Sequence, residues 1–225
     1  MTDGVLIAGG SRGTGLAVAQ LLSARGDAVT AFVRPTTDMK SILQHKVKLF
    51  RGDVLDPLAV RGAVASGNFR AVVSTVGGRR GEPRPDYHGT RNLVDAAREA
   101  GIRRFILVTT IGCGDSRGAV GPRVLEFLGA VLDEKTLGEN YLMESGLDYT
   151  ILRPGGMTSD PASGTGILTE DRNVMGVINR ADLARLIVEC LDDPRTFGKV
   201  FHAVDPAIKQ QAPLQRGEPL PGGRM

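Results

Sequence analysis

The sequence has few aromatic residues and no tryptophan. Aromatic side chains make up 4% of its 225 residues, and the formal net charge is only +3. Proteins that bind single-stranded nucleic acids stack bases on aromatic side chains along a positively charged groove. No stacking platform of that kind is visible here, and so small a net charge does not by itself indicate nucleic acid. We therefore expect no nucleic-acid partner.

Long apolar segments and paired cysteines are also missing. No apolar run approaches the roughly 18 residues of a membrane span, and Asp3 and Gly4 lead into the first apolar run without a signal segment. The two cysteines, Cys113 and Cys190, lack the spacing of a metal or redox site. We expect a cytoplasmic protein with free thiols, no metal site and no membrane contact.

Short apolar runs alternate with helical segments along the chain. The predicted strands are 5–8, 28–33, 47–50, 71–74, 105–108, 149–152 and an edge-like strand at 200–204. The predicted helices are 16–22, one beginning at 56–57, 86–100, a long region 122–145 interrupted by Gly129 and Gly138, and a short one starting near Asp182. Apolar strands without in–out alternation predict a parallel sheet covered on both faces. The fold class is α/β, a single Rossmann-type doubly wound sheet of about seven strands.

A glycine-rich turn follows the first strand. Gly9 supplies the freedom for a tight reversal, a side chain at Gly13 would obstruct a pyrophosphate, and Gly15 lets the next helix pack closely on the strand. The N–H groups at the start of that helix then face the phosphates. The candidate cofactor-binding residues of this turn are Gly9, Ser11, Arg12, Gly13, Thr14 and Gly15.

The second predicted strand ends in Arg34, where NAD-binding proteins carry an acidic residue for the ribose. An arginine accommodates the 2′-phosphate of NADP, and Arg12 could reach the same phosphate through forked hydrogen bonds. The residues favour NADP(H) as cofactor, although both arginines could instead be solvated. Residues 1–205 form the predicted NAD(P)-binding domain, with a small C-terminal region on the substrate side. Residues 206–225, rich in proline, glycine and glutamine, form a predicted loose tail.

Two further strand ends contribute candidate cofactor contacts. Asp53 could accept a hydrogen bond from the adenine amino group while Val54 packs on the ring, or Asp53 could simply be a turn residue. The fourth strand should end beside the glycine turn, so that the backbone from Thr75 to Gly77 passes close to the cofactor riboses.

A basic loop and a polar segment should flank the cleft. Arg79, Arg80 and Arg84 either attract an anionic acceptor or lie in a solvated loop. The glycine-rich segment 157–176 should wrap the mouth of the active site.

The order of motifs resembles a known family. The glycine turn is followed by Arg34, by Gly52-Asp53-Val54, by the helix from Gly89 to Ala97 and by the stretch SGLDYTILRPGG from Ser145 to Gly156. Over residues 4–205 this is similar to the atypical short-chain dehydrogenase/reductases, the NmrA-like proteins, and among them to the group of biliverdin reductase B and flavin reductase. Arg12 stands where that group more often has a glycine. The glycine spacing of this turn therefore looks more like that of the main catalytic branch of the short-chain dehydrogenase/reductases.

The resemblance implies an NADPH-dependent reductase with an altered catalytic set. Catalytic relatives use a Ser or Thr after the fifth strand and a Tyr-x-x-x-Lys on the next helix. Thr110 and Lys135 stand at the hydroxyl and lysine positions and are the catalytic candidates, but Val131 replaces the tyrosine. Tyr141 should lie off that face. Reductases of this group transfer hydride to a planar acceptor without the tyrosine: a flavin, a linear tetrapyrrole, or an enone- or quinone-like metabolite.

Several alternatives remain open at this stage. Lys135 could be a solvated helix lysine, Thr110 could only cap a turn, and Arg153 is expected to be a packing or ion-pair residue. The protein could also be a non-catalytic NADP-binding sensor or assembly factor of the NmrA-like type, or an isomerase or epimerase. We expect a monomer or small homo-oligomer acting on a small-molecule acceptor, possibly anionic.

Overall fold

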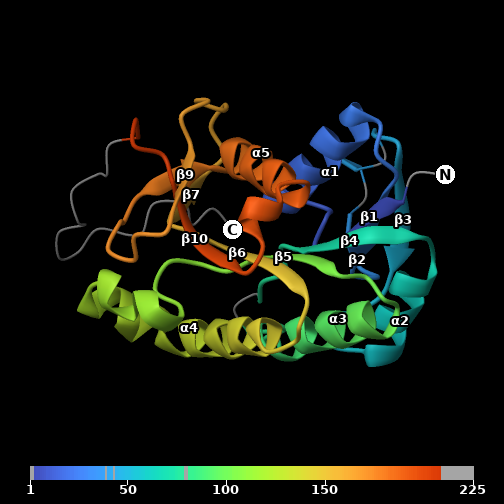
Figure 1. The fold of residues 1–225 in the computed structure, drawn as a ribbon, viewed down its shortest axis with the longest axis horizontal. Coiled ribbons are helices and arrows are strands. Elements are labelled where there is room, and N and C mark those ends of the chain that lie inside the picture. The colour runs from blue at the N-terminus through green and yellow to red at the C-terminus, as the bar shows by residue number, and fades with distance from the viewer. Residues whose placement is uncertain (1–2, 39, 43, 79–80, 209–225) are drawn as a thin grey trace.

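A central sheet lies between two layers of helices (Figure 1). The computed structural model describes residues 3–38, 40–42, 44–78 and 81–208. Two helices, α1 (Gly13–Arg25) and α5 (Arg180–Leu191), pack against each other on one face. The other face is covered by α2 (Pro57–Ala65), α3 (His88–Glu99) and α4 (Pro122–Met143). Two short 3₁₀ turns span Gly114–Ala119 and Pro194–Thr196.

The sheet has eight strands, in the order β3-β2-β1-β4-β5-β6-β10-β8. Their bounds are β3 (Val47–Arg51), β2 (Val29–Val33), β1 (Gly4–Ala8), β4 (Phe69–Ser74), β5 (Arg104–Val108), β6 (Asp148–Pro154), β10 (Lys199–Val204) and β8 (Ile167–Thr169). All neighbouring pairs are parallel except β10 with β8. The strand order reverses between β1 and β4, which is where open α/β sheets bind their ligands.

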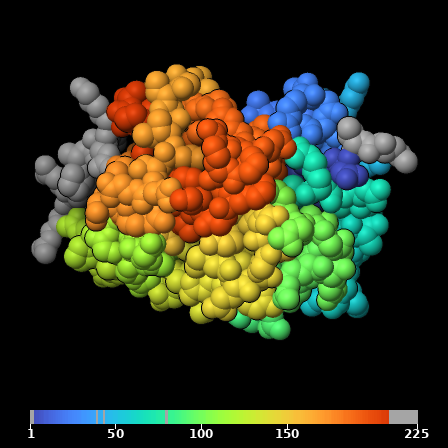
Figure 2. All heavy atoms as spheres, in the orientation of Figure 1, coloured from blue at the N-terminus to red at the C-terminus, as the bar shows by residue number. Residues whose placement is uncertain are grey.

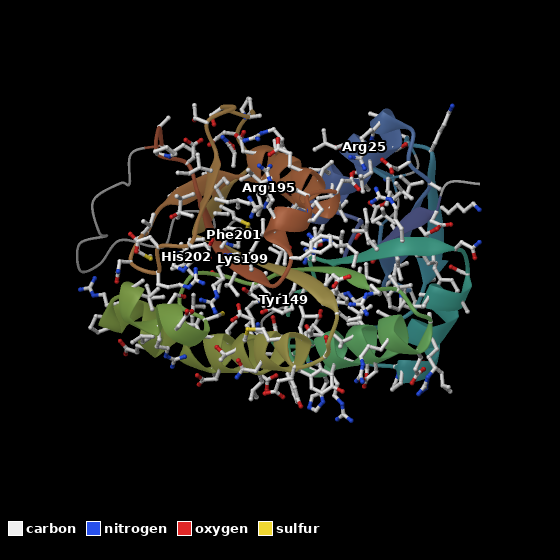
Figure 3. The ribbon with its side chains drawn as sticks, in the orientation of Figure 1. Arg25, Tyr149, Arg195, Lys199, Phe201 and His202 are labelled. Carbon is white, nitrogen blue, oxygen red and sulfur yellow. The ribbon has the colours of Figure 1, made fainter. Side chains whose placement is uncertain are left out.

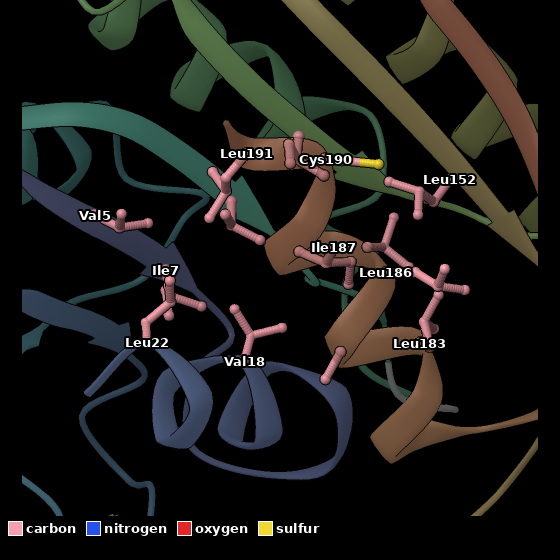
Figure 4. Close-up of a cluster of buried hydrophobic side chains, with 14 of the residues drawn as sticks. Val5, Ile7, Val18, Leu22, Leu152, Leu183, Leu186, Ile187, Cys190 and Leu191 are labelled. Atoms are coloured by element: carbon pink, nitrogen blue, oxygen red, sulfur yellow. The ribbon is translucent and has the colours of Figure 1, made fainter. Parts of the chain in front are cut away.

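Burial on both faces explains the unbroken apolar runs. Every residue of β1, β2 and β5 is buried. One apolar cluster joins the sheet to α1 and α5, and it contains Val18 and Leu22 of α1 together with Leu183 and Ile187 of α5 (Figure 4). A second joins it to α2, α3 and α4. The doubly wound α/β architecture predicted from the sequence is therefore confirmed.

The C-terminal part of the sheet differs from the prediction. The strand predicted at the edge, 200–204, is β10 and lies between β6 and an eighth strand, β8, which is antiparallel. A separate parallel pair joins β7 (Gly156–Thr158) to β9 (Val177–Asn179). Segment 157–176 thus contains short strands where little periodicity was visible, because three-residue strands are too short to show a period.

Helix α4 is continuous where the sequence indicated interruptions at Gly129 and Gly138. A Cβ on Gly138 would lie 2.9 Å from the carbonyl oxygen of Asp86. This glycine therefore permits the close approach of α4 to the start of α3 and does not break the helix. In the space-filling view, the yellow-green surface of α4 lies below the orange and red C-terminal part of the chain (Figure 2). Beyond residue 208, the predicted tail lies outside the described residues. Arg79 and Arg80 of the predicted basic loop also lie outside them.

Candidate functional site

The glycine turn has the shape that a dinucleotide requires. Gly9 and Gly13 have φ values of +86° and +53°. Residues with a Cβ rarely adopt such positive φ values. A Cβ on Gly15 would lie 2.4 Å from the Gly9 carbonyl oxygen and 2.5 Å from Thr75 Oγ1. The close packing predicted for Gly15 is thus present, and it joins the start of α1 to the ends of β1 and β4.

Thr75 fixes the end of β4 to this turn. Its Oγ1 donates to the carbonyl oxygens of Ala8 and Gly9, at 3.2 and 3.4 Å. Gly13 is exposed as the first residue of α1, and the first N–H groups of a helix lack partners within it. The turn therefore fits a pyrophosphate at the positive end of α1. Ser11 is half-buried in the same turn.

The residues predicted for the adenosine end also lie around this turn. Arg12 is the extended, exposed N-cap residue of α1. Arg34, directly after β2, pairs with Glu82, with Nη1 2.5 Å from Oε2. An arginine in a carboxylate pair has the forked geometry that also suits a phosphate. Arg34 is therefore ion-paired within the protein, which differs from the alternative of a merely solvated side chain.

Asp53 and Val54 follow β3. One carboxylate oxygen of Asp53 accepts from the Leu55 backbone N–H at 2.9 Å, which is the turn role kept open from the sequence. Val54 is nearly buried and packs against Gly89, since a Cβ added to Gly89 would lie 2.8 Å from Val54 Cγ2. The adenine contact proposed for these two residues stays a prediction.

On the opposite side of the turn, Lys135 is held by a buried carboxylate. Its Nζ lies 2.7 Å from Asp86 Oδ1, and the lysine side chain is only 13% exposed. The second oxygen of Asp86 pairs with Arg84 at 2.7 Å and accepts from the Gly78 N–H at 3.3 Å. A Cβ on Gly77 would lie 4.0 Å from Lys135 Nζ. The alternative of a solvated helix lysine is wrong, since α4 directs Lys135 to the end of β4.

The remaining members of the predicted catalytic set are placed differently. Thr110 Oγ1 donates to the Pro154 carbonyl oxygen at 3.2 Å, which ties the end of β5 to the end of β6. Tyr141 donates to Asp95 at 2.6 Å and lies under the Arg91 guanidinium, on the outer side of α3 and α4. Hydrogen bonding to Asp95 raises the pKa of its phenol. As predicted, Tyr141 is off the Lys135 face.

Arg153 belongs to a buried ion-pair network, as the sequence led us to expect. Its Nη2 lies 2.7 Å from Oε2 of Glu139, whose side chain is fully buried, and Arg153 also pairs with Asp115. Thr109 Oγ1 donates to Glu139 at 2.5 Å. Burial alone would raise the pKa of Asp115, but hydrogen bonds from Arg153 and Arg172 outweigh it and lower that pKa. The network joins α4 to the ends of β5 and β6.

Burial shifts the pKa values of both cysteines and of one histidine. Cys113 and Cys190 are free, as predicted. Both are also buried, and burial raises the pKa of each thiol to about 11. His202, on β10 (Figure 3), has its Nδ1 2.9 Å from the Val174 carbonyl oxygen. Burial lowers the pKa of His202, which favours a neutral ring.

Sequence reasoning missed two side chains of the site. The sequence predicts Asp86 as the start of a helix, and only the three-dimensional structure shows that it is buried between Arg84 and Lys135. Arg180, the first residue of α5, lies against Gly13, and no local signal connects it with that turn.

Two further searches covered the described residues only. Within them, no group of three or more His, Cys, Asp or Glu side chains is placed to hold a metal ion. None of the helices in this part of the chain is long and apolar enough to cross a membrane.

Comparison with known proteins agrees with this geometry. Residues 9–194 match the model of a family described as NAD(P)H-binding. The structure is similar to that of ChuY, an anaerobillin reductase from Escherichia coli O157:H7. The TM-score is 0.83 at 33% identity, covering 93% of this chain and 100% of the other.

Curated relatives come from plants as well. An uncharacterized chloroplastic protein of Arabidopsis thaliana is 33% identical over 90% of this chain and 77% of its own length. Sanguinarine reductase of Eschscholzia californica is 30% identical over 52% of this chain and 43% of its own length. The chain spans 25% of the Protein TIC 62 of Arabidopsis thaliana, at 32% identity.

The family match, the strand order and the glycine turn agree with the resemblance seen in the sequence. The chain belongs to the NAD(P)H-binding family, as an atypical short-chain dehydrogenase/reductase of the NmrA-like type.

Proposed function

We propose that this protein is an NADPH-dependent reductase that transfers a hydride to a planar acceptor. The acceptor class is a flavin, a linear tetrapyrrole, or an enone- or quinone-like metabolite. The observation that carries the proposal is the placement of Lys135 beside Gly77, with Asp86 holding its ammonium group and Val131 in place of a catalytic tyrosine. The relatives named as reductases of anaerobillin and sanguinarine support the same reaction class.

The chain's own residues would divide the work as follows. The turn from Gly9 to Gly15 binds the pyrophosphate, and Arg34 exchanges Glu82 for the 2′-phosphate of NADPH. Lys135 binds the nicotinamide ribose, and its positive charge stabilises the negative charge that develops on the acceptor. The bound dinucleotide would supply the hydride. Because Val131 has no proton to give, we infer that the acceptor takes its proton from water.

An apolar strip on α4 supports a planar, largely apolar acceptor. Val124, Leu128 and Val131 precede Lys135 at helical spacing, so they share its side of α4. Val124, Leu128 and the neighbouring Phe127 are exposed, and Phe127 to 73%. Large exposed apolar groups often mark a binding site. The strip leads from the surface toward Lys135, where a flat ring system would lie beside the nicotinamide.

A panel of acceptors tests the proposal. NADPH oxidation by the purified protein is followed by absorbance with FMN, biliverdin, a benzoquinone and an enone, each against a protein-free blank. We expect at least one acceptor to accelerate oxidation, and NADPH to be used in preference to NADH. Rates equal to the blank with every acceptor would contradict the reductase function.

The replacement of tyrosine by Val131 also favours a second candidate, a non-catalytic NADP-binding sensor or assembly factor. Such a protein binds oxidised and reduced cofactor with similar affinity and captures a protein partner only when the cofactor is bound. A pull-down that recovers the same proteins with and without NADP would exclude it. The cytoplasmic location and the small oligomeric state also stay predictions, and some of the relatives are described as chloroplastic.

A further inference from the structure

Arg180, the first residue of α5, places its guanidinium group against the glycine turn. Its Cδ and Nε lie 3.5 Å from the position that a Cβ on Gly13 would occupy. Gly13 opens α1, where the pyrophosphate is expected. We propose that Arg180 binds the pyrophosphate of the dinucleotide, an inference that rests on cofactor binding as part of the proposed function.

The packing of two helices fixes Arg180 at this place. Arg180 is the first residue of α5, as Gly13 is of α1. The two helices pack against each other, and one buried apolar cluster contains Val18 and Leu22 of α1 and Leu183 and Ile187 of α5 (Figure 4). Close-packed faces of this kind do not slide freely. The start of α5 therefore stays beside the start of α1 whether or not a ligand is bound.

The present partners of Arg180 leave its charge available to an anion. Nη1 donates to the Met157 carbonyl oxygen at 3.2 Å and to Ser159 Oγ at 2.9 Å. Both acceptors are neutral, so within the described part of the chain these bonds hold the guanidinium without cancelling its charge. A guanidinium presents five donors, and those not used here can bind phosphate oxygens in a forked arrangement.

The same contacts tie the substrate side of the protein to the cofactor. Met157 lies in β7 and Ser159 follows it, at the beginning of the segment expected to wrap the mouth of the site. Thr14 Oγ1 also lies 3.9 Å from Met157 Sδ. Arg180 would therefore link a bound pyrophosphate to the segment that begins at β7. Arg34 by contrast is placed to distinguish NADPH from NADH.

This division of roles defines the experiment. Dissociation constants are measured by calorimetry for NADPH, NADH and adenosine 2′-monophosphate, with wild-type protein, R180Q and R34Q. We expect R180Q to weaken NADPH and NADH by a similar factor of about tenfold or more, and to leave adenosine 2′-monophosphate unchanged because that probe lacks the pyrophosphate. R34Q should weaken NADPH and adenosine 2′-monophosphate but not NADH.

A matched control is R195Q, which removes the same charge beyond the other end of α5, where Arg195 is 89% exposed (Figure 3). Its affinities should equal those of the wild type. Melting temperatures without ligand separate binding from folding, and R180K, which keeps the charge without the fork, replaces R180Q if that variant is unstable. Wild-type affinity of R180Q for NADPH and NADH would overturn the proposal. Failure of the wild type to bind either dinucleotide would instead overturn the proposed function.

Discussion

Asp86 holds two cations at one buried position. Its side chain has no exposed surface and lies 2.7 Å both from Lys135 Nζ and from Arg84 Nη2. A buried charge that loses its partner is costly because water cannot replace the lost interaction. The positions of Lys135 and Arg84 therefore depend on a carboxylate that is fully buried.

We predict that D86N lowers the free energy of unfolding by about 3 kcal/mol or more, since two cations then lose their carboxylate. D95N is a matched control on α3, where the carboxylate is about one-third exposed, pairs with Arg91 at 3.7 Å and accepts from Tyr141 at 2.6 Å, a bond that an amide oxygen can also accept. It should cost about 1 kcal/mol or less. Urea denaturation measures both, and equal losses for the two variants would contradict this role of Asp86.

The pairs of Asp115 predict a pH dependence of stability. Arg153 and Arg172 lower the pKa of Asp115 in the folded state below its ordinary value of 3.8. Such a group stabilises the fold fully above that ordinary value, and its contribution disappears as the pH falls through the lowered pKa. The melting temperature of D115N should therefore lie below that of the wild type at neutral pH, and the gap should narrow only below about pH 4. A gap that is constant from pH 7 to pH 3 would count against the ion pairs.

At the scale of elements, the two ends of α4 differ in their packing. Its C-terminal half is fixed by Glu139 and by Gly138, which lets the helix approach Asp86. Its N-terminal half exposes Val124, Phe127 and Leu128. Lys135 lies just past the middle of the helix. The packed end therefore positions the lysine, and the exposed end is where we propose that an acceptor binds.

The two glycines of α4 should respond in opposite ways to alanine. In Gly138→Ala the new Cβ would meet the Asp86 carbonyl oxygen at 2.9 Å, and we expect a loss of about 1–3 kcal/mol from overpacking. In Gly129→Ala the nearest atom is a flexible arginine nitrogen at 3.7 Å, so the better helix former should stabilise by about 0.5–1 kcal/mol. Chemical denaturation gives the sign of the change in the free energy of unfolding for each variant. A stabilised Gly138→Ala variant would contradict the close approach of α4 to Asp86.

The elements that could be predicted from sequence are those whose pattern is local. Short, unbroken apolar runs such as 71–74 and 105–108 predicted β4 and β5 because central strands are buried on both faces. The glycine turn could be predicted because backbone geometry dictates its residues. Strand β8 could not, since its three residues, one exposed and two half-buried, are too few to show a period and are held by pairing with β10. Asp86 and Arg180 were missed because their partners are distant in sequence.

At the scale of the whole molecule, the parallel sheet brings separate strand ends to one edge. Gly9, Arg34, Thr75 and Thr110 follow β1, β2, β4 and β5, and the parallel register places these ends together. The cofactor should therefore bridge several elements and stabilise all of them. Binding to the folded state alone raises stability by about 2.7 kcal/mol at a hundredfold excess over Kd.

We predict that saturating NADPH raises the melting temperature by about 5–10 °C, since 1 kcal/mol corresponds to about 2–4 °C in a protein of this size. NADH at the same concentration should raise it less, because it lacks the 2′-phosphate that we propose Arg34 binds in place of Glu82. Thermal shift assays with both dinucleotides check this. Equal shifts would contradict the assignment of Arg34 to the 2′-phosphate.

Single-turnover oxidation of bound NADPH tests the central claim most directly. Protein in slight excess over NADPH is mixed with the best acceptor of the panel, and absorbance of the reduced nicotinamide is followed for the wild type and for K135M. The account predicts stoichiometric oxidation by the wild type and a rate about a hundredfold lower in K135M, with NADPH still bound. NADPH that stays bound and reduced in the wild type with every acceptor would contradict the account and favour the sensor.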